Sequence, residues 1–115
     1  MGVKIVQIVV THAHFDHFLA ATEIRKATGA PLLLHKADLM LFKALPIQCA
    51  MIGMPAPKQA VADPDAYLTD EQTLAVRGGR VLHTPGHSPG SCCFYFEHDA
   101  IVCTGDTLFR QSVGR

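Results

Sequence analysis

Several features that mark large protein classes are missing from this sequence of 115 residues. It has 10 Lys or Arg against 10 Asp or Glu and no basic stripe, so nucleic acid and anionic membranes are not expected as partners. No apolar run is long enough to span a bilayer, and the N-terminus lacks the flanks of a signal peptide. We therefore expect one small cytoplasmic domain.

Cysteine is also scarce. The four cysteines have no CxxC spacing, and they are Cys49, Cys92, Cys93 and Cys103. Cys92 and Cys93 are adjacent and would point to opposite faces of a strand. Without a secretory signal, we expect reduced, buried thiols.

What the sequence does contain is a cluster of metal-ligand side chains in the segment THAHFDHF. Directly after the apolar run of residues 3–10 come three histidines and one aspartate: His12, His14, Asp16 and His17. Imidazole nitrogens and carboxylate oxygens bind a borderline metal such as zinc at neutral pH. His12, His14 and Asp16 alternate, so an extended segment projects them to one side, while His17 can face a second site. This one segment could therefore serve two adjacent metals.

Hydrophobic periodicity and turn residues predict alternating strands and helices. We expect helices over residues 17–28 and 37–44, an irregular loop over 49–64, and strands over 3–10, 32–35, 66–76, 80–84, 91–96 and 100–103. Asp16 is expected to cap the first helix, and residues 104–115 to form a loop. This order argues for an α/β or α+β fold, with helices on one face of a sheet and a right-handed parallel crossover between the first two strands.

Two later segments offer further ligands. His87 lies between Pro and Gly pairs in TPGHSPG, a rigid turn that suits a ligand held in one orientation. Asp106 follows a short apolar strand in CTGDT, where a carboxylate with two oxygens can bridge two cations. Each signal alone is weak, because a lone His in a turn or an Asp after a strand is most often structural.

Together, THAHFDH at 11–17, TPGHSPG at 84–90 and GDTLF at 105–109 resemble the motifs of the metallo-β-lactamase-fold hydrolases. The form of the second motif and the final run GDTLFRQSVGR look most like the glyoxalase II-like, or hydroxyacylglutathione hydrolase-like, branch. The motifs occur in the family's order, and the resemblance covers nearly the whole chain.

The resemblance implies a site for two metal ions, expected to be zinc, with iron or manganese as alternatives. The ligands of the first metal match His12, His14 and His87. Asp16 and His17 match ligands of the second metal, and Asp106 matches the carboxylate that bridges the two metals. The family adds one more histidine downstream of that aspartate, whereas this sequence has no histidine after His98.

The resemblance also implies a partial fold. The family fold is an αββα sandwich of two similar halves, and the matching motifs place this chain in its middle. We therefore expect residues 1–115 to form a single partial domain that lacks N-terminal strands and a C-terminal segment. A fragment of this kind would self-associate through bare core side chains: Val3, Ile5, Ile8, Val10, Phe94 and Phe96.

The activity that the resemblance implies is hydrolysis of a small-molecule thioester or ester by a metal-activated hydroxide. Asp106 would orient the nucleophile, and Asp16 would accept a proton when it is not bound to metal. Arg110 and Arg115 flank the site loop and could bind an anionic substrate group. Three further histidines match no family ligand and are expected to be structural or solvated: His35, His83 and His98.

Three alternatives remain open on the sequence alone. The same site could act on a lactone, a β-lactam or a phosphodiester. His12, His87 and Asp106 could instead form the two-histidine, one-carboxylate triad of a mononuclear iron persulfide dioxygenase, which the superfamily also contains. The chain could also be an inactive fragment that only packs against another chain.

Overall fold

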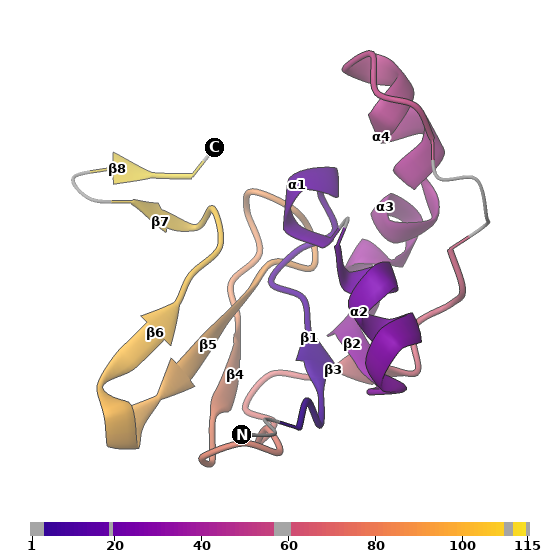
Figure 1. Cartoon of the computed structure of the whole chain (residues 1–115). Coiled ribbons are helices and arrows are strands. Elements are labelled where there is room, and N and C mark those ends of the chain that lie inside the picture. The colour runs from indigo at the N-terminus through magenta and orange to yellow at the C-terminus, as the bar shows by residue number, and fades with distance from the viewer. Residues whose placement is uncertain (1–3, 19, 57–60, 110–111, 115) are drawn as a thin grey trace.

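The computed structural model describes residues 4–18, 20–56, 61–109 and 112–114, and it has the mixed helix-and-strand fold that was predicted (Figure 1). The helices are α1 (Phe15–Phe18), α2 (Ala21–Thr28), α3 (Leu39–Lys43) and α4 (Leu45–Met51), with 3-10 turns η1 (Lys36–Asp38) and η2 (Glu97–Asp99). The strands are β1 (Ile8–Val9), β2 (Leu32–His35), β3 (Ala66–Leu68), β4 (Arg80–His83), β5 (Cys92–Phe96), β6 (Ile101–Cys103), β7 (Leu108–Phe109) and β8 (Ser112–Val113). Within those ranges, every helix is too short or too polar to cross a membrane.

The first sheet lies between the helices and the second sheet (Figure 1). Its strand order is β1-β2-β3 with both pairs parallel, so the predicted parallel pairing of the first two strands is confirmed. Along β2, Leu32 and Leu34 belong to the helix-side core with Phe42, whereas Leu33 packs against the second sheet with Val81. This alternation is the two-residue period of a strand that is buried on both faces.

The second sheet is antiparallel, with the order β4-β5-β6. The predicted hairpin between β5 and β6 is confirmed, and η2 followed by Ala100 in the left-handed region closes it. The Cys92 amide donates a hydrogen bond to the Thr11 carbonyl at 2.8 Å. This bond joins β5 to the chain just after β1, so the two sheets meet where the histidine cluster begins.

Three predicted boundaries near the N-terminus are wrong. Only Ile8–Val9 pairs as a strand, rather than residues 3–10. Its one neighbour among the described strands, β2, begins at Leu32 opposite Ile8, so residues 4–7 have no partner strand there. The helix predicted over residues 17–28 is split into α1 and α2. Asp16 lies inside α1 and does not cap it.

The irregular loop predicted over residues 49–64 begins later than expected, because α4 continues to Met51, while residues 52–56 and 61–64 contain no helix or strand. Pro46 lies in the first turn of α4, where its missing N–H has no helical acceptor to lose, so a proline is compatible with the start of this helix. The strand predicted over residues 66–76 ends at Leu68, and residues 104–115 contain the short pair β7 and β8.

Burial differs from the prediction at two core positions. Val10 and Phe94 were expected on a bare surface but are buried, since the helix-side core covers Val10 and the two sheets enclose Phe94. Ile5 is exposed, Ile8 and Phe96 are partly buried, and Val3 lies outside the described residues. Self-association therefore remains a prediction.

The thiols follow the prediction at three of four positions. Cys49, Cys92 and Cys93 are buried and free, whereas Cys103 is exposed on the outer strand β6. Burial raises the pKa of the Cys92 thiol to about 12, so Cys92 is not a thiolate nucleophile at neutral pH.

Asp38, the last residue of η1, is fully buried and connects three stretches of backbone. Its Oδ2 accepts hydrogen bonds from the Ala13 amide at 2.9 Å and the Ser88 hydroxyl at 2.7 Å, and its Oδ1 accepts one from the Gly90 amide at 2.6 Å. A Cβ at position 90 would lie 2.7 Å from Asp38 Cγ, so this close approach requires glycine. The carboxylate thus fixes Ala13 relative to the 84–90 turn.

Replacing Asp38 should therefore destabilise the whole chain. Asp38→Ala leaves the buried amides of Ala13 and Gly90 without an acceptor and removes a hydrogen bond of the Ser88 hydroxyl, and it should lower the free energy of unfolding by about 3 kcal/mol or more. Asp38→Asn keeps the shape and one acceptor oxygen and should cost less. Urea unfolding measures both, with the exposed Asp63→Ala as the control. An Asp38→Ala variant as stable as Asp63→Ala would contradict the assignment.

Candidate metal centre

Four separate stretches of chain deliver the predicted ligands to one place. The segment after β1 carries His12 and His14, and helix α1 carries His17. The 84–90 turn carries His87, and the segment after β6 carries Asp106. Gly105 has a φ of +55°, and a Cβ there would lie 3.1 Å from His12 Nδ1. Glycine at this position therefore lets the backbone that carries Asp106 lie directly against His12.

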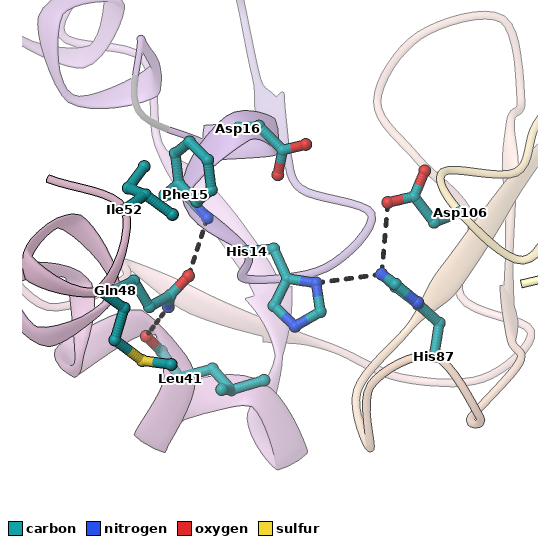
Figure 2. Close-up of a pocket in the computed structure, with 9 residues that line it drawn as sticks. His14, Phe15, Asp16, Leu41, Gln48, Ile52, His87 and Asp106 are labelled. Carbon is teal, nitrogen blue, oxygen red and sulfur yellow. Dashed lines mark hydrogen bonds and ion pairs between the residues drawn. The ribbon is translucent and has the colours of Figure 1, made fainter. Parts of the chain in front are cut away.

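His12, His14 and His87 form one group of possible metal ligands. One ring nitrogen from each lies within 4.8 Å of those of the other two. His14 Nδ1 is 3.0 Å from His87 Nε2 (Figure 2). Three imidazole nitrogens that converge in this way are the donor set of a three-histidine zinc site.

Asp106 lies against the same group and contributes to a second one. Its Oδ2 is 3.0 Å from His17 Nε2, 3.2 Å from His87 Nε2 and 3.3 Å from His12 Nε2. His12, His17 and Asp106 form the second group, again with ligand atoms within 4.8 Å of one another. Asp106 therefore lies where a carboxylate shared between two neighbouring ions would lie.

These spacings fit a bound metal. Ligands about 2.0–2.1 Å from a tetrahedral zinc are roughly 3.3 Å apart, and the separations around Asp106 Oδ2 are close to that value. His12 Nε2 is buried and has no hydrogen-bond partner in the described part of the chain, a costly state for a polar nitrogen. When His12 Nδ1 donates to Thr11 Oγ1, which is 3.1 Å away, Nε2 presents the lone pair that a metal needs.

Asp16 is not brought into either group. Its side chain is 56% exposed, and its Oδ2 lies 3.5 Å from His17 Nε2. Figure 2 shows its carboxylate above His14, on the side of the pocket that faces Asp106. Asp16 thus borders the second group without joining it. The two predicted substrate residues, Arg110 and Arg115, lie outside the described residues.

Burial and neighbouring imidazoles keep His12 neutral. Desolvation, followed by the charges of His17 and His14, lowers the pKa of His12 to about 4, against the opposing effect of Asp106. Desolvation acts to raise the pKa of Asp106, but His17, His12 and His87 together hold it below its usual value. At neutral pH the centre therefore offers a neutral imidazole and a carboxylate, the protonation states that bind metal.

Gln48 on α4 supports the ligand segment from the helix side. Its Oε1 accepts a hydrogen bond from the Phe15 amide at 2.9 Å, and its Nε2 donates to the carbonyls of Ala13 at 3.0 Å and Leu41 at 2.8 Å. The backbone on both sides of His14 is thus held by one side chain. The sequence analysis missed both Gln48 and Asp38, because a single Gln in a helix and a single Asp after a strand carry no distinguishing pattern.

His35 and His83 belong to neither ligand group among the described residues, in line with the resemblance. Their rings stack with centroids 3.9 Å apart, which joins the ends of β2 and β4. His83 Nε2 lies 3.0 Å from the Pro89 carbonyl, so His83 supports the turn that carries His87. His98 is exposed in η2, at the hairpin.

Acidification should destabilise the metal-free chain through His12. Folding lowers the pKa of His12 from 6.5 to about 4, so the unfolded chain binds more protons in that interval. The free energy of unfolding should fall by up to about 3 kcal/mol as the pH drops from about 6.5 towards 4. Urea unfolding in EDTA, at about pH 7.5 and about pH 4.5, measures this loss. It should be much smaller in His12→Gln and unchanged in His98→Gln, and the same loss in all three proteins would overturn the assignment.

Comparison with protein families matches the metallo-beta-lactamase superfamily over residues 1–115. A Bacillus subtilis protein named probable metallo-hydrolase YqgX is 32% identical over 117 residues, which cover 99% of this chain and 54% of the relative. The Haemophilus influenzae hydroxyacylglutathione hydrolase GloC is 31% identical over 112 residues, which cover 94% of this chain and 52% of the relative. The chain thus spans about half the length of these relatives.

Two solved structures agree in both fold and sequence. TTHA1623 in a di-iron-bound form has a TM-score of 0.86 and 40% identity, over 96% of this chain and 54% of that chain. The BLEG-1 B3 metallo-beta-lactamase has a TM-score of 0.82 and 37% identity, over the same shares of 96% and 54%. With the family match over the whole sequence, these likenesses show that the chain belongs to the metallo-beta-lactamase superfamily of metallo-hydrolases.

Proposed function

We propose that this protein hydrolyses thioesters or esters in the manner of glyoxalase II, with two metal ions as cofactors. The observation that carries the proposal is the convergence of two ligand groups beside a cavity of about 450 Å³, which His14, His87 and Asp106 help to line. Relatives named hydroxyacylglutathione hydrolase support the choice of substrate class, at about 30% identity over part of their length.

The chain's own side chains divide into two binding groups in this proposal. His12, His14 and His87 would hold one ion, His17 would hold the other, and Asp106 would contribute to both. Asp16, 3.5 Å from His17 Nε2, is a further ligand of the second ion and a proton acceptor when it is not bound. Ions held there would supply the Lewis acidity that deprotonates water at neutral pH and polarises a carbonyl group.

The protein's own side chains orient the attacking water and hold the ligand histidines in position. The pKa of Asp106 lies below its usual value, so at neutral pH its carboxylate can accept a hydrogen bond from the attacking water and orient it. His87 and His14 keep their positions because Asp38 and Gln48 hold the backbone beside them. A thiolate leaves readily, so a thioester needs little further acid catalysis from the site.

Two similar solved structures favour one alternative activity and one alternative metal. BLEG-1, named a B3 metallo-beta-lactamase, is 37% identical, so β-lactam hydrolysis is a second candidate activity. TTHA1623 is described in a di-iron-bound form, so iron is an alternative to zinc as the cofactor.

Zinc titration should reveal one tight and one weaker binding event in this chain. The group of His12, His14 and His87 supplies three imidazoles, whereas the second group shares His12 and relies on the more exposed His17 and Asp106. His87→Ala should weaken the tight event at least about 100-fold. Calorimetry measures both events, and His98→Ala should leave them unchanged. Two equally tight events, or a tight event that survives in His87→Ala, would refute the ligand assignment.

The metal-loaded chain should hydrolyse S-lactoylglutathione or a simple acyl thioester. Asp106→Asn removes the shared charge and should lower kcat at least about 100-fold. Asp63→Asn, an exposed carboxylate outside the ligand groups, should retain full activity. The loss of thioester absorbance follows the reaction. A protein that binds both metals yet cleaves neither thioester nor ester would sink the proposal, and β-lactam cleavage by that protein would select the second candidate.

A further inference from the structure

The cavity beside the metal centre has two chemically different ends. His14, His87 and Asp106 line one end, and Phe15, Leu41, Met51 and Ile52 line the other. Figure 2 shows the labelled apolar residues on one side of His14 and the pair His87 and Asp106 on the other. A molecule whose reacting group lies at the ligand end can therefore extend along the cavity towards this apolar wall, to which α1, α3 and α4 contribute.

The apolar end has little spare polar capacity. Gln48 is the polar residue there, but both of its N–H groups donate to backbone carbonyls and its oxygen accepts from the Phe15 amide. The described lining residues include no Lys or Arg, and their only carboxylates are those of Asp16 and Asp106. A charged anionic substituent at this end would lose water without gaining an ion pair.

Two of the four side chains of the apolar wall are open to solvent, while Phe15 and Leu41 pack against the core. Met51 is 82% exposed and Ile52 is 48% exposed, so neither is held in the core. Exposed apolar side chains that gather beside a site commonly mark a surface that a ligand covers. Methionine suits such a wall, because its flexible thioether adapts to ligands of different shape.

We propose that this apolar end binds an uncharged, apolar substituent of the substrate, attached to the carbonyl group that is cleaved at the ligand end. The position of the carbonyl group rests on the proposed function, whereas the preference for an apolar substituent rests on the lining residues. The volume of about 450 Å³ falls within the usual range of small-molecule sites, roughly 300–1,000 Å³. The substituent can belong to the acyl group or to the leaving thiol.

Kinetics with two series of substrates show whether the apolar substituent belongs to the acyl group or to the leaving thiol. One series lengthens a straight acyl chain on a fixed thiol, and the other lengthens the thiol's alkyl chain on a fixed acetyl group. The series that enters the cavity should gain about threefold to fourfold in kcat/KM per added methylene. Replacing the terminal methyl of its longest member by a carboxylate should abolish the gain. A flat response in both series, or a preference for the carboxylate, would overturn the proposal.

A matched pair of variants tests the wall itself. Met51→Ser changes the cavity, while Met40→Ser changes a side chain that is equally exposed, at 80%, on α3 but outside the lining. Met51→Ser should reduce the gain in kcat/KM per added methylene. Met40→Ser should behave as the unchanged chain. Equal effects of the two variants would contradict the assignment of Met51 to the site.

Binding can be measured without catalysis. In the metal-free chain labelled at its methionine methyl groups, the neutral ketone octan-2-one should shift the NMR signal of Met51 saturably and leave that of Met40 unchanged. This result together with no hydrolysis of any substrate would reject the proposed function and retain the apolar site. Hydrolysis without a saturable Met51 shift, or equal shifts of Met51 and Met40, would reject the apolar site.

Discussion

The buried carboxylate of Asp38 is the contact on which the metal centre depends. The segment with His12 and His14 extends from the first sheet, whereas His87 lies in a turn that leaves the second sheet. Strand pairing does not fix these segments relative to each other. Because one side chain accepts hydrogen bonds from Ala13, Ser88 and Gly90, the two segments share an anchor in the protein interior, beside the backbone bond between Thr11 and Cys92. The distance between ligand histidines is thus set by a residue that is not a ligand.

The helix layer adds a second support from the opposite side. Gln48 holds Ala13 and Phe15, the residues on either side of His14, while the buried Leu45 and Cys49 secure α4 in the core. A polar side chain used in this way is saturated by backbone groups. It contributes rigidity to the metal centre and leaves the adjoining cavity wall apolar. The same hydrogen bonds of Gln48 therefore support the metal centre and determine the apolar character of the cavity wall beside it.

The sequence predicts those ligands and elements that follow from the pattern of neighbouring residues. The alternating histidines, the TPGHSPG turn and the aspartate after β6 identify the ligand types, and the structure gathers five of the six proposed metal ligands into two groups. Short apolar runs also predict β2 and the β5–β6 hairpin. Local sequence patterns do not predict long-range contacts. Asp38, for example, accepts hydrogen bonds from residues 25, 50 and 52 positions away along the chain. Helix α4 was not predicted, because a proline such as Pro46 can follow the end of one helix or lie in the first turn of the next, and packing decides between them.

The exposure of Met51 and Ile52 bears on how this site can evolve. Met51 is the last residue of α4 and Ile52 directly follows it, and the position of this helix is already secured by Gln48, Leu45 and Cys49. Substitutions at these two surface positions therefore cost little folding stability, unlike substitutions in the core. Selection can reshape the substrate range of the cavity there without disturbing the metal centre, which gives related lineages a route to new substrates on an unchanged catalytic frame.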